Sequence, residues 1–472
     1  MVAKLHSLLS RALAALALCL PVVAAAQDPE RELVPEQRQP LAFVSPTGFA
    51  PLGSRMVYAA FHAVHGQELW ITDGSAAGTR MLKDIRPGFR GAFPAWQTAF
   101  RGRVYFTATD GASGLELWRT DGTAAGTVQV ADLRPGAEGS MPGELTVFGD
   151  ALYFVAADGR GGFQLWKTQG DAKSTTPVTA IAGGRAVVRQ LTVAGRRMFF
   201  TATTPEHGHE LWVTEGTPAT TRMVKDIRPG TQDGAVQGLV AMGDAVYFAA
   251  SDGARGLELW RSDGTAEGTR IVRDLRPGEG ASRPAHLVAL GGRLYFAADD
   301  GVHGIELWAT DGTESGTQLV KDIHVGPGGS VSSPVVAMQG ALYFSATDGA
   351  TGAELWRSDG TAAGTVLVKD LQPGTASGSP ARFAVIGRQL WFSATDGASG
   401  VEPWTSDGTA AGTRQVADLA AGTRDAVPLG FRGLGASVLF VADDGNGNER
   451  LWRSGPDGRV TLLGVPLRAR LR

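Results

Sequence analysis

The sequence has almost no cysteine and no long hydrophobic run beyond its first residues. Its only cysteine among 472 residues is Cys19, which lies in a segment that we expect to be removed, so a fold held together by disulfides is excluded. No later segment approaches the ~20 consecutive apolar residues that a membrane-spanning helix needs. We therefore expect no membrane span.

The chain also lacks a large excess of charge of either sign. Without Lys4 and Arg11 the chain carries 42 basic and 47 acidic residues, a net charge of −5. These charges are interspersed, and no basic patch of the kind that binds a phosphate backbone is present, so no nucleic acid partner is expected. The locally basic end, residues 468–472, is interpreted as a solvated tail.

The first 26 residues have the features of a secretory signal. Lys4 and Arg11 precede the apolar stretch 13–20, and three alanines, 24–26, precede Gln27. We expect cleavage after Ala26, a linker over residues 27–40, and a secreted or periplasmic mature protein. A lipoprotein anchored at Cys19 is disfavoured, because the bulky Leu18 precedes the cysteine.

Glycine is abundant, with 65 residues, and the chain repeats itself. A tryptophan, mostly in a Leu-Trp pair, recurs nine times, at intervals of 48 residues and once of 46: Trp70, Trp118, Trp166, Trp212, Trp260, Trp308, Trp356, Trp404 and Trp452. A strict period of this length indicates one supersecondary unit copied along the chain. The repeats cover residues 41–467.

One repeat reads as four short strands separated by glycine-bearing turns. In the unit around Trp308, the runs 294–298 and 305–308 are apolar on both faces, and a sheet of that kind must be covered on both sides. The sequence therefore predicts an all-β chain, a β-propeller of four-stranded antiparallel blades. Nine units in one ring are expected, and eight blades plus a capping unit remain the alternative.

The repeat resembles that of a known family. The string from Glu116 to Leu133, ELWRTDGTAAGTVQVADL, is similar to the ELWxxDGT repeat of secreted bacterial proteins, and copies of it cover nearly the whole mature chain. The resemblance implies an extracytoplasmic protein of propeller type. It implies no shared catalytic activity.

Three acidic positions recur, and each favours a structural role. They are a glutamate before Leu-Trp, the first residue of an Asp-Gly-Thr turn, and an aspartate after the fourth strand, represented by Glu306, Asp311 and Asp322. A buried carboxylate needs hydrogen-bond partners, and aspartate in a turn accepts from nearby amides. No metal site is assigned, although calcium at the turns stays an alternative. The histidines of one repeat position, His65 and His303 among them, belong to nonadjacent units and do not converge on an ion.

Residues that break the repeat are the candidates for function. Nine positions before the second-strand aromatic the residue varies, and in a propeller the first strand lines the central channel. We therefore predict a ligand-binding site at the channel mouth made of Trp96, Glu144, Gln190, His286 and Arg382. Solvated rim residues without a ligand are the alternative.

The sequence favours binding over catalysis. No nucleophile elbow, metal-ligand helix or phosphate loop is present, so no catalytic residue and no cofactor is assigned. We expect an exported, monomeric, noncatalytic repeat scaffold that binds a protein or polysaccharide partner through its loops and channel mouth. The alternative is a propeller enzyme acting on glycans or esters, for which Glu144 and His286 are the available acid and base.

Overall fold

The computed structural model describes residues 47–464. The predicted signal (1–26), the linker (27–40) and the basic tail (468–472) lie outside the described residues. Residues 47–464 belong to one compact unit and form 36 strands. They contain two 3-10 turns, η2 (Ile181–Gly184) and η3 (Pro218–Thr220), and no α-helix, which confirms the all-β prediction. Within this range no helix has the length and apolarity to cross a membrane.

Successive strands pair antiparallel in chain order, as predicted for a meander. Seven repeats form separate four-stranded sheets. These are β1 (Thr47–Leu52) to β4 (Arg80–Lys83) through β2 (Arg55–His62) and β3 (Gly66–Thr72); β5 (Ala95–Phe100), β6 (Arg103–Ala108), β7 (Glu116–Thr120), β8 (Val128–Ala131); β17 (Gln237–Met242), β18 (Ala245–Ala250), β19 (Glu258–Ser262), β20 (Arg270–Arg273); β21 (Ala285–Leu290), β22 (Arg293–Asp299), β23 (Ile305–Thr310), β24 (Gln318–Lys321); β25 (Val336–Met338), β26 (Ala341–Ala346), β27 (Glu354–Ser358), β28 (Val366–Lys369); β29 (Ala381–Ile386), β30 (Gln389–Thr395), β31 (Val401–Ser406), β32 (Arg414–Gln415); and β33 (Leu429–Leu434), β34 (Ser437–Asp443), β35 (Glu449–Ser454), β36 (Val460–Leu463).

The third and fourth repeats share one eight-stranded sheet. Its strands are β9 (Gly143–Phe148), β10 (Ala151–Ala157), β11 (Phe163–Thr168), β12 (Thr176–Pro177), β13 (Val187–Ala194), β14 (Arg197–Thr204), β15 (Gly208–Thr214) and β16 (Arg222–Lys225). The two meanders are joined by a single parallel pairing of Phe163 with Val187. Because β12 has only two residues, the third repeat lacks a full fourth strand, as does the eighth repeat with the two-residue β32.

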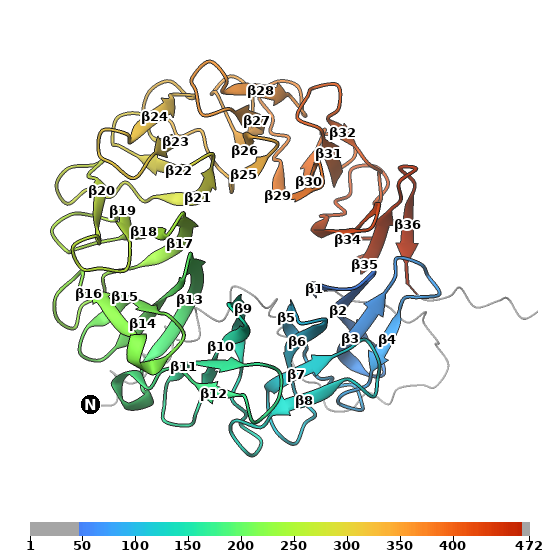
Figure 1. The fold of residues 1–472 in the computed structure, drawn as a ribbon. Coiled ribbons are helices and arrows are strands. Elements are labelled where there is room, and N and C mark those ends of the chain that lie inside the picture. The colour runs from blue at the N-terminus through green and yellow to red at the C-terminus, as the bar shows by residue number, and fades with distance from the viewer. Residues whose placement is uncertain (1–46, 465–472) are drawn as a thin grey trace, which may run out of the picture. The chain divides into compact units, whose positions relative to one another are not determined.

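The first strand of each meander lies on the inner side of this unit, as β13, β17 and β21 show in Figure 1. The fourth strand lies on the outer side, as β16, β20 and β24 show. Consecutive sheets bury their apolar faces against each other: Leu307 of β23 packs in one cluster with Phe344 and Trp356 of the next repeat. A further cluster joins Tyr58 and Trp70 of the first repeat with residues of β34, β35 and β36 in the last repeat. The first and last repeats therefore pack against each other in the same way as repeats that are consecutive in the sequence.

A lysine of one repeat covers the recurring tryptophan of the next repeat. Lys321 Nζ lies 5.8 Å from the ring centroid of Trp356 and donates a hydrogen bond to the Thr365 carbonyl oxygen at 2.8 Å. The same pair of contacts recurs at Lys83, Lys225 and Lys369. The tryptophan thus stabilises the packing of consecutive repeats in two ways: its ring face contacts the lysine, and its side chain buries apolar area.

The recurring glutamate ties two connections of its own repeat together. Glu306 accepts hydrogen bonds from the Ile323 and His324 amides, each at 3.2 Å, and from the Ser330 hydroxyl. This confirms the predicted structural tie. In the third repeat Gln164 takes its place, accepting from the Ile181 amide and donating to the Ala186 carbonyl.

The Asp-Gly-Thr turns use their carboxylate internally and face the preceding repeat. Asp311 Oδ1 accepts from the amide and the hydroxyl of Thr313 at 2.9 and 2.7 Å, and these bonds hold the pKa of Asp311 below its usual range. Gly312 has φ 93°, and a Cβ there would lie 2.2 Å from Tyr247 Oη of the preceding repeat. Both the backbone conformation and the close approach therefore require glycine.

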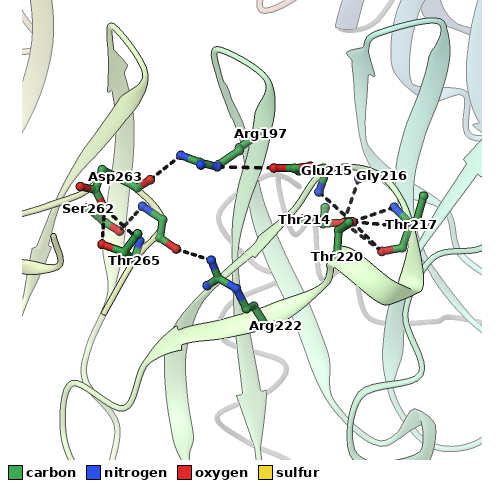
Figure 2. Close-up of polar contacts among 11 residues, drawn as sticks. Arg197, Thr214, Glu215, Gly216, Thr217, Thr220, Arg222, Ser262, Asp263 and Thr265 are labelled. Carbon is green, nitrogen blue, oxygen red and sulfur yellow. Dashed lines mark hydrogen bonds and ion pairs between the residues drawn. The ribbon is translucent and has the colours of Figure 1, made fainter. Parts of the chain in front are cut away.

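Arginines add polar ties between these turns. Figure 2 shows Arg197 reaching from β14 to the turns of two successive repeats. Its Nη1 donates to the Asp263 carbonyl oxygen at 2.6 Å, and its Nε lies 3.8 Å from Glu215 Oε1. Arg222 donates to the Gly264 carbonyl oxygen at 2.7 Å. The turn of one repeat is thus held by side chains of the repeat before it.

We predict that Lys321→Met destabilises the fold. The substitution keeps the alkyl stem but removes the ammonium, so it deletes the bond to Thr365 and the contact with Trp356, and we expect a loss of about 1–2 kcal/mol in the free energy of unfolding. Urea denaturation measures the change. Lys173→Met, at an exposed position, is the control, and equal midpoints for the two variants would show that the lysine contributes nothing.

A second prediction concerns Glu402, whose pKa is raised from 4.5 to about 7 by burial. The folded chain then binds a proton that the unfolded chain has lost, so this contribution to stability is complete below pH 4.5 and is lost as the pH rises toward 7. We compare the free energy of unfolding of the wild type with that of Glu402→Gln at each pH. The wild-type value minus the variant value should fall by on the order of 2–3 kcal/mol across that window. Glu314→Gln, an exposed counterpart, should show no such trend; a flat difference for Glu402 as well would refute the assignment.

Candidate functional site

The five predicted site residues occupy equivalent positions on inner strands. Trp96 is on β5, Glu144 on β9, Gln190 on β13, His286 on β21 and Arg382 on β29. Their φ angles are 59°, 54°, 58°, 56° and 57°, and the strand pairing shifts register around each of them. The variable position is therefore a β-bulge whose residue has a left-handed backbone conformation.

This backbone conformation is unfavourable for residues other than glycine. Gly238 and Gly430 occupy the same position in two other repeats, with φ of 68° and 67°. A side chain in the left-handed region costs roughly 1–2 kcal/mol, and strain of this kind is concentrated at functional sites. The chain keeps bulky side chains at five bulges where glycine would be less strained, which favours a role for those side chains beyond folding.

Three of the five residues lie together. Trp96, Glu144 and Gln190 line an open cleft of about 420 Å³. The cleft crosses the inner strands β5, β9, β13 and β17, and its other lining residues are Leu145, Thr146, Leu191, Thr192, Gly238 and Leu239. It has the size of a small-ligand site.

His286 and Arg382 are not among the residues that line this cleft. Burial lowers the pKa of the His286 imidazole. Arg382 Nη1 donates to the Val427 carbonyl oxygen of the next repeat at 2.9 Å. The acid and base considered from the sequence, Glu144 and His286, are therefore not brought together in this cleft.

Glu144 is the ionisable group of the cleft lining. Its Oε2 accepts a hydrogen bond from the Leu191 amide of the next repeat at 3.1 Å. Burial raises the pKa of Glu144, and this outweighs the hydrogen bond from Leu191 and the charge of Arg189, both of which lower it. A carboxyl group of this kind keeps its proton closer to neutral pH and can act as a general acid.

The neighbours of Glu144 offer an apolar face and a fixed amide. Trp96 is 51% exposed, and its indole lies beside Gly143, where an added Cβ would be 3.2 Å from Nε1. Gln190 Oε1 accepts from the Gly238 amide at 2.9 Å, and its Nε2 donates to the Val236 carbonyl at 3.4 Å. Each side chain reaches toward the next repeat, so the cleft depends on how successive inner strands are placed.

Sequence reasoning missed a row of threonines beside these residues. Thr98, Thr146 and Thr192 stand two positions after the bulge residue, and each donates its hydroxyl to the bulge carbonyl, at 3.0, 2.9 and 3.4 Å. The other six repeats carry Ala50, Val240, Val288, Val336, Ala384 and Arg432 there. A comparison of the repeats at this position would have found the signal, because threonine occurs there only in the three consecutive repeats whose bulge residues are Trp96, Glu144 and Gln190.

The described residues hold no group of three or more histidine, cysteine, aspartate or glutamate side chains arranged for a metal ion. The histidines that share a repeat position pair with single carboxylates instead. His65 Nδ1 lies 2.6 Å from Asp84 Oδ2, and His303 Nδ1 lies 2.7 Å from Asp300 Oδ2.

Comparison with known proteins yields likenesses of structure alone. No family model and no curated protein matches the sequence. Among solved structures, a puromycin hydrolase S511A mutant matches with a TM-score of 0.38 and 17% identity over 77% of this chain and 58% of its own. A puromycin-hydrolyzing peptidase of Mycobacterium tuberculosis matches with 0.40 and 15% over 70% and 53%. The β-propeller domain of the Trilobed protease from Pyrococcus furiosus matches with 0.36 and 10% over 69% and 97%.

With TM-scores of 0.36 to 0.40 these matches carry no argument for the fold, which is described by its own four-stranded sheets. The chain spans little more than half the length of the two puromycin-hydrolyzing proteins. The expectation of a noncatalytic scaffold that binds a protein or polysaccharide is contradicted, since the matching structures are of hydrolases and peptidases. What those proteins cleave is not transferred to this chain, because identities of 17% and less concern the fold.

We predict that Trp96→Gly leaves the fold as stable as the wild type or raises the free energy of unfolding by up to about 1 kcal/mol. Glycine relieves the left-handed strain, and the half-exposed indole contributes little burial. Urea denaturation measures the change. Destabilisation beyond about 1 kcal/mol would show that the indole is kept for packing instead.

Proposed function

We propose that this chain is a propeller enzyme that cleaves carbon–oxygen bonds of glycans or esters in the cleft of the inner strands, with Glu144 as the proton donor. The observation that carries the proposal is the placement of Glu144: a carboxyl group whose pKa is raised by burial lines a cleft beside a half-exposed tryptophan. A raised pKa in a cleft is typical of general acids.

The chemistry needs one proton transfer in each direction. Glu144 gives its proton to the leaving oxygen as the carbon–oxygen bond breaks, and a water oxygen forms the new bond to carbon. The proton released by that water returns to the Glu144 carboxylate, so the products are the two hydroxyl compounds or the alcohol and the acid. The backbone amide of Leu191 stabilises the carboxylate between the two transfers.

We also propose that nine repeats close into one ring. The apolar cluster shared by the first and last repeats supports closure. The ninth repeat has four full strands, β33 to β36, paired in order, which favours a ninth blade over a capping unit. Calcium is not needed for the turns, since the carboxylate of Asp311 and its equivalents is already engaged within the turn.

The setting of this activity is proposed from the sequence. The signal-like residues 1–26 and the ELWxxDGT-like repeats support an exported protein in the periplasm or outside the cell. Detection of a chain that begins at Gln27 in the exported fraction tests this setting.

The activity is tested with purified protein on a panel of aryl glycosides, oligosaccharides and aryl esters. We expect cleavage of at least one class, and Glu144→Gln should lower kcat at least about a hundredfold without unfolding the chain. Because the protonated form is the acid, activity should decline as the pH rises, at a higher pH than an ordinary carboxyl would give.

Glu314→Gln, the same substitution at an exposed loop position, is the matched control and should keep full activity. The proposal fails if the wild type cleaves no member of the panel, or if Glu144→Gln is as active as the control.

A further inference from the structure

We infer that the cleft recognises an uncharged, hydroxyl-rich glycan chain, and that the threonine row Thr98, Thr146 and Thr192 marks the face that reads it. This inference rests on the proposed function and names the substrate class of the same site. It is carried by three properties of the cleft: its hydroxyls, its charge and its aromatic wall.

The threonine row presents oriented hydroxyl groups. Each hydroxyl hydrogen is committed to the carbonyl of the bulge residue two positions earlier, as in Thr146 with Glu144. The hydroxyl oxygens are thereby left with lone pairs that accept hydrogen bonds. Thr146 and Thr192 line the cleft on adjacent inner strands, so a ligand that crosses from β9 to β13 meets an acceptor on each of these two strands. A chain of sugar hydroxyls supplies the matching donors.

The charge of the lining disfavours acidic ligands. The lining contains one carboxyl group, Glu144, and no lysine or arginine. Arg189, whose charge acts on Glu144, lies over the Phe163 ring, with its guanidinium carbon 5.1 Å from the ring centroid. A uronic acid unit would place a carboxylate near Glu144 without a cation to pair it, and this costs binding energy.

The aromatic wall favours a sugar ring over a small ester. Trp96 exposes about half of its surface at one end of the cleft, held there by the strained bulge. At the other end Gly238 leaves open space, because a Cβ added there would meet nothing within 4 Å. An elongated ligand can therefore stack on the indole, pass Glu144 and Gln190, and continue over Gly238.

The test measures binding of soluble neutral oligosaccharides, namely cello-, xylo-, manno- and malto-hexaose, against oligogalacturonate and oligomannuronate of equal length. Calorimetry at pH 8, where Glu144 carries more charge, should give at least one neutral ligand a Kd about tenfold below that of either uronate. Glu144→Gln should shrink this preference to about threefold or less, because the repelling carboxylate is gone.

Two further variants separate recognition from folding. Thr192→Val removes the hydroxyl at constant shape and should weaken neutral binding about three- to tenfold, whereas Thr192→Ser should keep it. Trp96→Ala should weaken it at least about fivefold. His286→Ala is the matched control, because it alters the same bulge position outside the cleft and should leave the Kd unchanged.

The outcomes distinguish this inference from the proposed function. Uronates that bind as tightly as neutral chains, or a Thr192→Val variant equal to the wild type, overturn the inference. Glu144-dependent cleavage of esters without binding of any neutral glycan overturns it too, while the proposed function stands. Neutral chains that bind as predicted but are never cleaved support the inference and sink the proposed catalysis.

Discussion

The structure depends on one constraint: each small sheet is apolar on both faces and is stable only when a neighbour covers each face. Phe296 and Phe344, on the second strands of successive repeats, are fully buried because the sheets stack at their sides. The lysine that lies over the next tryptophan, as Lys321 does over Trp356, and the turn carbonyls that accept from arginine orient this stacking. Consecutive sheets are thereby held at a repeated spacing.

That spacing creates the cleft. Because every blade presents its first strand toward the inside, the bulge residues of adjacent repeats become neighbours although they are nearly fifty residues apart in sequence. Glu144 bonds to Leu191 and Gln190 bonds to Gly238, so the side chains that break the repeat are positioned by the strands that obey it. The strained left-handed backbone turns these side chains out of the ordinary strand alternation.

Carboxylates serve two opposite purposes in the molecule. Those in the repeat, such as Glu306 and Asp311, are surrounded by hydrogen-bond donors of their own repeat and stabilise connections. Glu144, like Glu306, has a pKa raised by burial, but it is only half-buried and lines an open cleft. The raised pKa of Glu402 therefore marks architecture, whereas a shift in the same direction at Glu144 marks a candidate for chemistry, because only access to a ligand separates the two cases.

The sequence by itself determined the all-β class, the four-stranded meander and the structural role of the recurring acids, since these follow from local periodicity, turn residues and the need to satisfy buried carboxylates. It also singled out the variable inner position. Only the tertiary structure decided that Trp96, Glu144 and Gln190 share a cleft while His286 and Arg382 lie outside it, and that Thr146 and Thr192 line that cleft. The reason is physical: side chains of different repeats meet only after the faces of the sheets have packed, and no local pattern encodes those distances.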